Sequence, residues 1–146
     1  MKIIVVGKLK EKYLKEASDE YLKRLTKYIN INLIEIEDMN DTSKSLELES
    51  EKILKNISPK DFVVTLEIEG KELTSLELSD KINTWPINNL VFVIGSSNGL
   101  SNEVKERSNY QLSFSKMTFP HQLFRIMLLE QIYRAFKILN NEKYHK

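Results

Sequence analysis

The sequence contains no cysteine, only three prolines and four glycines, and no long hydrophobic run. Without cysteine, disulfides, thiolate metal ligands and cysteine nucleophiles are excluded, and a cytoplasmic location is favoured. The apolar runs are far shorter than the roughly 20 residues that a membrane span requires, so we expect no membrane partner. The run Ile3–Val6 is also too short for a signal peptide, and a charged segment follows it. We interpret it as a first strand.

An excess of charge of one sign is missing as well. Lys and Arg number 22 against 21 Asp and Glu, which leaves a net charge of +1. Such a protein does not hold bare nucleic acid by overall charge, so a nucleic-acid partner would have to be bound by a local patch. With 146 residues, 41% of them hydrophobic and 29% charged, the chain is typical of a single globular domain spanning residues 1–146.

Hydrophobic patterns typical of strands and helices alternate along the chain. The expected strands are Ile3–Val6, Ile31–Ile36, Phe62–Ile68, Leu90–Ile94 and Leu112–Met117. The expected helices are 10–28, a second one with Asp41, Thr42 and Ser43 as N-cap candidates, 73–85, 101–107 and about 120–139. This alternation predicts an α/β fold with a mostly parallel sheet and helices on both faces.

The loops that follow the strands are the expected ligand site, because open parallel sheets bind ligands beyond the carboxyl ends of their strands. The first loop, 7–9, lacks the glycine spacing of dinucleotide-binding and phosphate-binding loops. The loop 95–100 has small residues whose backbone can approach a ligand, although such residues are also common in plain turns. The loop 114–119, followed by Pro120 and His121, has aromatic and Met side chains that could flank a purine ring or fill the core.

Three segments resemble the ribosomal RNA large-subunit methyltransferase H family of the knotted SPOUT class. They are 92–100 (FVIGSSNGL), 112–121 (LSFSKMTFPH), and the helix 130–135 (EQIYRA) with the terminal Tyr144-His145-Lys146. The similarity extends to 6–10 and 65–71, and so covers essentially the whole chain.

The resemblance implies a C-terminal trefoil knot, an obligate homodimer and S-adenosylmethionine as cofactor. The implied reaction is methylation of N3 of a pseudouridine, in the stem-loop of large-subunit ribosomal RNA that faces the small subunit of the ribosome. The resemblance assigns cofactor binding to Leu66, Gly95, Phe114, Ser115, Lys116, Met117, Thr118 and Phe119. It also assigns the terminal Tyr144, His145 and Lys146 to the substrate site, where an arbitrary protein would have a frayed end.

The sequence departs from the family pattern at two places. Ser96 stands where the family usually has a second glycine, and a positive φ there would strain a serine. The connecting segment 37–43 is shorter than is usual in the family, and length changes in such loops cost little.

The chemistry of methyl transfer is compatible with the residues present. In-line displacement from a sulfonium requires neither a metal nor a covalent enzyme intermediate, so we expect no metal. Because N3 must lose a proton, a base or a cation near it would help. The candidates are His121, Arg125, Arg134, His145 and Lys146. His121 could instead bind backbone groups at a helix start, and Arg134 could simply form an i,i+4 ion pair with Glu130.

The last expected helix is apolar nearly all round, which requires cover on several sides. A monomer core could provide it, but at this chain length we expect a partner subunit. Two other functional classes are compatible with the pattern. A non-catalytic nucleotide sensor would not need the terminal tripeptide, and a ribosome-associated assembly factor without activity would not bind S-adenosylmethionine.

Overall fold

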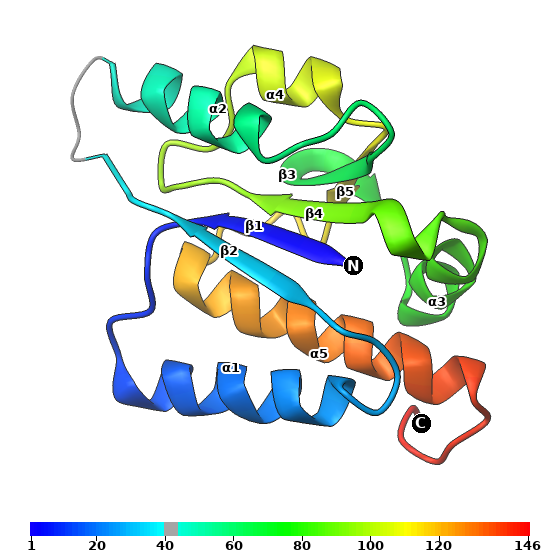
Figure 1. Ribbon diagram of the computed structural model, residues 1–146. Helices are drawn as coiled ribbons and strands as arrows, with labels where there is room; N and C mark the ends of the chain where they lie inside the picture. The colour runs from blue at the N-terminus through cyan, green and yellow to red at the C-terminus, as the bar shows by residue number, and fades with distance from the viewer. Residues whose placement is uncertain (40–43) are drawn as a thin grey trace.

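The computed structural model describes residues 1–39 and 44–146. Its strands are β1 (Lys2–Val6), β2 (Asn32–Ile36), β3 (Phe62–Glu72), β4 (Leu90–Ile94) and β5 (Tyr110–Ser113). They form one sheet in the order β2-β1-β4-β3-β5, and every neighbouring pair is parallel. The carboxyl ends of the strands therefore meet at one edge, on the left of Figure 1. The expected parallel α/β architecture is confirmed.

Helices cover both faces of the sheet (Figure 1). On one face lie α2 (Ser45–Lys55) and α4 (Asn102–Arg107), and on the other lie α1 (Lys12–Leu25), α3 (Ser75–Thr84) and α5 (His121–Leu139). A short 3-10 turn, Ile87–Asn89, precedes β4. Among the described residues, no helix is both long and apolar enough to cross a membrane.

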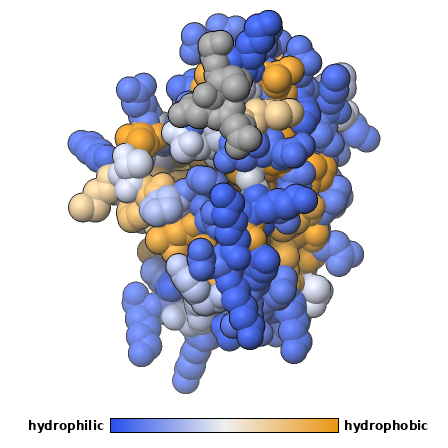
Figure 2. Space-filling view, turned by 90° about the vertical axis from the view of Figure 1, so that its left-hand side faces the viewer, coloured by the Kyte–Doolittle hydropathy of each residue, from blue (hydrophilic) through white to orange (hydrophobic). Residues whose placement is uncertain are grey.

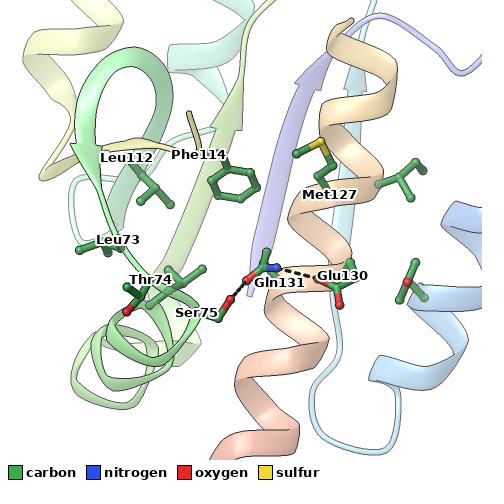
Figure 3. A pocket seen from close by; sticks show the side chains of 11 residues that line it. Leu73, Thr74, Ser75, Leu112, Phe114, Met127, Glu130 and Gln131 are labelled. Atoms are coloured by element: carbon green, nitrogen blue, oxygen red, sulfur yellow. Dashed lines mark hydrogen bonds between the residues drawn. The ribbon is translucent and has the colours of Figure 1, made fainter. Parts of the chain in front are cut away.

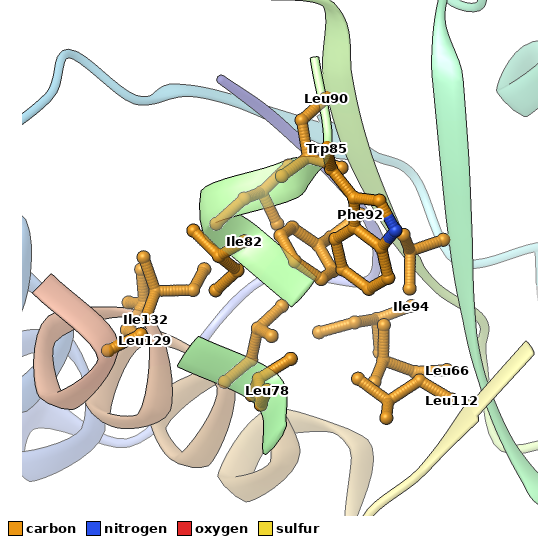
Figure 4. Close-up of a cluster of buried hydrophobic side chains, with 14 of the residues drawn as sticks. Leu66, Leu78, Ile82, Trp85, Leu90, Phe92, Ile94, Leu112, Leu129 and Ile132 are labelled. Carbon is orange, nitrogen blue, oxygen red and sulfur yellow. The ribbon is translucent and has the colours of Figure 1, made fainter. Parts of the chain in front are cut away.

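The core lies in two layers because successive strand residues point to opposite faces. Ile3 and Val5 of β1 face the α1/α3/α5 side, whereas Ile4 and Val6 face the α2/α4 side. β4 is buried along its whole length, as its unbroken apolar run predicts. Figure 4 shows the larger layer, in which Phe92 and Trp85 pack in a T-shaped arrangement with centroids 6.3 Å apart. Burying each large side chain of this kind contributes about 1.5 to 3 kcal/mol.

α5 is covered unevenly. Its inner face, with Leu128, Leu129, Ile132 and Ala135, is buried against the sheet. α1 and α3 lie on either side of α5 (Figure 1) and leave most of its remaining apolar side chains half-buried. Leu123, near its start, is 39% exposed. The chain's own helices therefore cover part of the apolar surface and leave part of it open.

Two strands, β3 and β5, differ from the sequence prediction by more than one residue at an end. β5 is Tyr110–Ser113 and not 112–117, because a serine turn directs the chain out of the sheet. In that turn the Ser113 hydroxyl donates to the Ser115 carbonyl (3.1 Å), and the Ser115 hydroxyl accepts from the Met117 N–H (3.0 Å). β3 continues to Glu72, with a shift of register against β5 between Leu66 and Lys71. The N-cap candidates Asp41, Thr42 and Ser43, and most of the short segment 37–43, lie outside the described residues.

The far end of β3 passes directly over the backbone of β5. A Cβ on Gly70 would lie 2.7 Å from the carbonyl carbon of Leu112 and 2.8 Å from that of Gln111. No side chain fits there, so a glycine is required for this close crossing. The crossing holds the segment after Leu66 beside the loop that follows β5.

Candidate functional site

The C-terminal half of β3 and the loops after β4 and β5 surround a cavity of about 420 Å³ at the carboxyl edge of the sheet. All but one of the residues assigned to cofactor binding line it: Leu66, Gly95, Phe114, Ser115, Met117, Thr118 and Phe119. Lys116, the exception, is exposed. Figure 2 views the molecule from this edge and shows hydrophobic side chains in the middle of a hydrophilic face. Met117, 71% exposed, is one of the exposed apolar residues of this region.

The loop after β4 forms one wall of the cavity, and the backbone of Gly95 and Gly99 makes up much of this wall. A Cβ on Gly95 would lie 2.3 Å from the Gly99 carbonyl oxygen, and the Gly99 N–H donates to the Ser96 carbonyl (2.9 Å). Gly99 itself has a φ of 78°. Ser96 does not have a positive φ, so the strain that its side chain would suffer there is absent. Its hydroxyl donates instead to the buried Glu49 of α2 (2.8 Å).

Aromatic rings form the opposite wall. The Phe114 and Phe124 ring centroids lie 4.9 Å apart, and Phe119 lies 6.3 Å from Phe124. Phe114, Phe119 and Phe124 are all only half-buried, so these rings bound the cavity and do not simply fill the core. Such a slot is suited to one face of a flat aromatic ligand.

Glu67 is a cavity residue that we did not predict. Its side chain is 7% exposed, accepts a hydrogen bond from the Thr65 hydroxyl (2.6 Å) and forms an ion pair with Lys105 (3.5 Å). The Thr-x-Glu spacing could have suggested it, because residues two apart on a strand share a face. A carboxylate held in this way can accept hydrogen bonds from ligand hydroxyls. Among the described residues, no group of His, Asp and Glu side chains is placed to hold a metal ion.

His121 and Arg125 both lie at the N-terminal end of α5, but only His121 lines the cavity. His121 lines the cavity and also an adjoining polar hollow of about 390 Å³. A Cβ on Gly7 would lie 3.1 Å from His121 Nε2, so a glycine leaves room for the imidazole. Arg125 is 4% exposed, donates to the Gly7 carbonyl (2.8 Å) and pairs with Glu35 (3.6 Å). Burial lowers the pKa of Arg125, and Glu35 opposes the shift. Arg125 lines neither hollow and joins the loop after β1 to α5.

The other candidates gather at the opposite end of α5. Arg134 donates to Glu130 Oε1 from Nη2 (2.6 Å) and Nε (3.0 Å), so the predicted ion pair is confirmed. The Tyr144 hydroxyl donates to the same oxygen (3.1 Å), and Arg134 Nη1 lies 3.3 Å from His145 Nδ1. Burial and the bond to Glu130 raise the pKa of Tyr144, so its phenol stays protonated. Lys146 is exposed beyond them.

A defined turn directs the C-terminal residues back along α5. Asn141 has a φ of 54°, its N–H donates to the Ile138 carbonyl (3.0 Å), and the Glu142 N–H donates to the Lys137 carbonyl (2.9 Å). This pair of bonds is a Schellman motif. The Glu142 carboxylate then binds Lys137, Lys27 and the Tyr28 hydroxyl, which together lower its pKa to about 2. The end of the chain is thus anchored to α5 and to the turn after α1 and is not frayed.

A groove of about 380 Å³ between α1, α3 and α5 links these two regions (Figure 3). Phe114 lines both the groove and the cavity, and Glu130 lines the groove and binds the C-terminal residues. Its wall is mainly apolar, with Leu73 and Met127 facing it. One polar chain crosses it, in which Ser75 donates to Gln131 (2.7 Å) and Gln131 donates to Glu130 (2.8 Å).

Both the sequence and the fold of this chain are similar to those of known proteins. Residues 1–145 match the family described as predicted SPOUT methyltransferase. A solved structure of a probable methylase family protein from Haemophilus influenzae has the same fold, with a TM-score of 0.60 at 16% identity over 99% of this chain and 70% of that one. TrmJ of Z. mobilis aligns with a TM-score of 0.53 at 13% identity over 91% of this chain and 68% of that one.

Two curated relatives are much closer in sequence. The ribosomal RNA large subunit methyltransferase H of Clostridium tetani is 56% identical, over 99% of this chain and 98% of that protein. The protein of the same name from Clostridium botulinum strain Alaska E43 is 54% identical over the same shares. The chain therefore belongs to the ribosomal RNA large subunit methyltransferase H family of SPOUT methyltransferases, as its motifs predict.

Proposed function

We propose that this protein is an S-adenosylmethionine-dependent methyltransferase that modifies N3 of a pseudouridine in large-subunit ribosomal RNA. The names of its curated relatives support the ribosomal RNA substrate. One structural observation supports the cofactor, and the N3 target follows from the family resemblance. Seven of the eight residues that the resemblance assigns to the cofactor, from β3 and from the loops after β4 and β5, line one cavity of about 420 Å³.

The cavity fits S-adenosylmethionine in its chemistry. Phe114, Phe119 and Leu66 would bind the adenine ring, because their apolar and aromatic surfaces match its faces. Glu67 can accept hydrogen bonds from ribose hydroxyls, and Gly95 allows the close approach of a ligand to the backbone. When bound, the cofactor supplies an electrophilic methyl group on its sulfonium. It carries no phosphate, so the chain needs no phosphate-binding loop.

The chain's own task is to hold the target base and manage its N3 proton. His121 reaches the cavity from α5 and is the candidate base on that side. Arg134, whose Nη1 lies 3.3 Å from His145 Nδ1, carries a positive charge that can stabilise the deprotonated base. Tyr144 keeps its proton and binds Glu130, so its role is to donate a hydrogen bond and to fix Arg134, whose guanidinium lies 4.8 Å from its ring centroid.

Within one subunit these two groups cannot meet. His121 begins α5, whereas Arg134 lies 13 positions further along it, which at 1.5 Å per residue is about 20 Å away. Two copies packed with their α5 helices antiparallel would bring the C-terminal residues of one beside the cavity of the other. The half-buried apolar side chains of α5, with Leu123 exposed, provide a surface for that contact. We therefore propose a homodimer with shared sites.

Subunit complementation tests the shared site. One variant lacks Tyr144–Lys146 and the other carries Gly95→Ala, which obstructs the cavity. With S-adenosylmethionine held near the wild-type Kd, each alone should have almost no activity. After unfolding and refolding together, half of the dimers are mixed and each mixed dimer has one intact site, so activity should reach about a quarter of the wild-type value. No recovery, with mixed dimers verified by tag pull-down, would contradict the shared site.

The activity itself is tested in two stages. Titration calorimetry with S-adenosylmethionine should show binding by the wild type and by the variant without Tyr144–Lys146. Labelled methyl transfer to intact ribosomes, separated subunits and naked ribosomal RNA should then be strongest with intact ribosomes, because a chain of net charge +1 has little electrostatic hold on bare RNA. The shortened variant should lose transfer. A shortened variant that still transfers methyl groups would remove the terminal residues from the site, and absent cofactor binding would exclude the enzyme.

A further inference from the structure

We infer that Glu49 is a positioning residue for the cofactor cavity, which it controls through Ser96. This inference rests on the proposed function. Glu49 belongs to α2, on the face of the sheet that α5 does not cover, and is 1% exposed. Its Oε2 accepts a hydrogen bond from the Ser96 hydroxyl (2.8 Å), and its Oε1 accepts one from the Met39 N–H (3.1 Å).

Ser96 transmits this contact to the cavity wall. Its hydroxyl accepts a hydrogen bond from the Asn98 N–H (3.3 Å) while it donates to Glu49, and its carbonyl accepts from the Gly99 N–H (2.9 Å). Ser96 thus closes the turn that forms the wall after β4. Because Gly95 and Gly99 offer no side chain to fix that turn, its position depends on the hydroxyl and on the carboxylate behind it.

The carboxylate also joins two loops at the same edge of the sheet. Met39 follows β2, and Ser96 follows β4, so both lie beyond carboxyl ends of strands. A buried carboxylate is retained only where its hydrogen bonds offset the loss of hydration, and both oxygens of Glu49 have donors. Removing the Ser96 hydroxyl leaves the hydrogen bond from the Met39 N–H in place, so the contact with Ser96 can be tested separately from the contact with Met39.

Three variants and one control separate positioning from plain stability. Ser96→Ala removes only the hydroxyl. Glu49→Gln keeps the size of the side chain, but its amide N–H₂ then faces either the Ser96 hydroxyl or the Met39 N–H, which are both donors. The double variant combines the two changes. Asp61→Asn is the matched control. Asp61 is also buried, accepts a backbone N–H (Ser58, 2.8 Å) and binds Lys2 (3.1 Å), but lies just before β3, at the opposite edge of the sheet.

We expect Ser96→Ala and Glu49→Gln each to raise the Kd for S-adenosylmethionine roughly tenfold in calorimetry. At saturating cofactor, kcat on ribosomes should stay within about twofold, because only uniform binding has been weakened. The double variant should be no worse than about tenfold, because both changes break one linkage. Asp61→Asn should lower the melting temperature and leave the Kd unchanged.

The outcomes against the inference are distinct. If Ser96→Ala left the Kd for S-adenosylmethionine unchanged, Ser96 would not position the cavity wall. Additive losses in the double variant would mean that Ser96 contacts the cofactor directly and that Glu49 acts independently. A loss of affinity that tracks melting temperature in all variants, Asp61→Asn included, would reduce Glu49 to a structural residue. If the wild type bound no S-adenosylmethionine, the proposed function would fail, and this inference with it.

Discussion

The two ends of α5 are built on different physical principles. At its N-terminal end, the cavity is bounded by backbone and by apolar rings, and its shape depends on glycines that leave no room for a Cβ. At its C-terminal end, a charged and aromatic cluster centred on Glu130 and Arg134 is held by hydrogen bonds. The first region should therefore be sensitive to added atoms, and the second to lost charges.

This difference also separates the two tasks of a methyl transfer. A cofactor that is bound by shape and by stacking needs a rigid wall, which a parallel sheet supplies through its strand ends. In the proposed reaction the target base develops negative charge and needs donors and cations, which the C-terminal cluster can supply. Changes in the first region should alter cofactor affinity, and changes in the second should alter the rate.

The largest effect is expected for Gly95→Ala. Its Cβ would lie 2.3 Å from the Gly99 carbonyl oxygen, so the turn that forms the cavity wall must shift. We expect the Kd for S-adenosylmethionine, measured by calorimetry, to rise by about 100-fold, which corresponds to about 2.7 kcal/mol. Gly99→Ala is the comparison, because nothing lies within 4 Å of a Cβ there and only the positive φ is unfavourable. It should cost about 1 kcal/mol or less in affinity. Equal losses in the two variants would refute the steric account.

The second effect is expected for Glu130→Gln, which should slow methyl transfer while leaving the cofactor Kd within about twofold. The amide keeps one acceptor but loses the charge that holds Arg134 and Tyr144, so the rate should fall roughly thirtyfold in single-turnover assays with labelled cofactor. Glu20→Gln is the matched control, because it breaks a similar i,i+4 pair with Arg24 (2.7 Å) on the exposed face of α1. If both variants slowed transfer equally, the cluster would have no special role.

The sequence predicted the layers well because they depend on local patterns. Alternating and unbroken apolar runs place β1 and β4 in the sheet, and the motif at 114–119 predicted residues that line the cavity. The end of β5 was mispredicted because Leu112–Met117 continues an apolar pattern that a serine turn interrupts.

The contacts that were not predicted join residues far apart in the chain. Glu49 and Ser96 are 47 positions apart, and each, viewed locally, is a polar residue in a helix or a turn. Arg125 reaches Gly7, 118 positions away, so its burial could not be inferred from helical spacing. The trefoil knot stays a prediction from the family resemblance, because periodicity does not encode how a chain is threaded.

A third effect is expected for Arg125→Met, which tests whether this arginine belongs to the reaction or to the fold. Its guanidinium is buried and binds the Gly7 carbonyl and Glu35, so its loss should lower the free energy of unfolding by about 1.5 kcal/mol. Methyl transfer per folded molecule should stay within about threefold. Denaturant unfolding and activity assays on the same samples measure both. Lys12→Met, at an exposed ion pair of α1, should change neither. If the methyl-transfer rate fell much more than the fraction of folded protein, Arg125 would have to act in the reaction itself.

The smallest effect concerns Glu142, which anchors the C-terminal residues to α5 and to the turn after α1. Its pKa is lowered from 4.5 to about 2 by hydrogen bonds from Lys137, Lys27 and Tyr28, in that order. The anchoring is therefore complete above pH 4.5 and is lost as the pH falls toward 2. The carboxyl titration, followed by NMR, should have its midpoint near 2, and Lys137→Met should raise that midpoint more than Lys27→Met. Because the cavity lies at the other end of α5, Glu142→Gln at neutral pH should release the C-terminal residues without altering the chemical shifts of the Gly95–Gly99 turn. A midpoint at the ordinary value would show that the anchor is absent in solution, and concerted changes at both ends of α5 would show that the two regions are not independent.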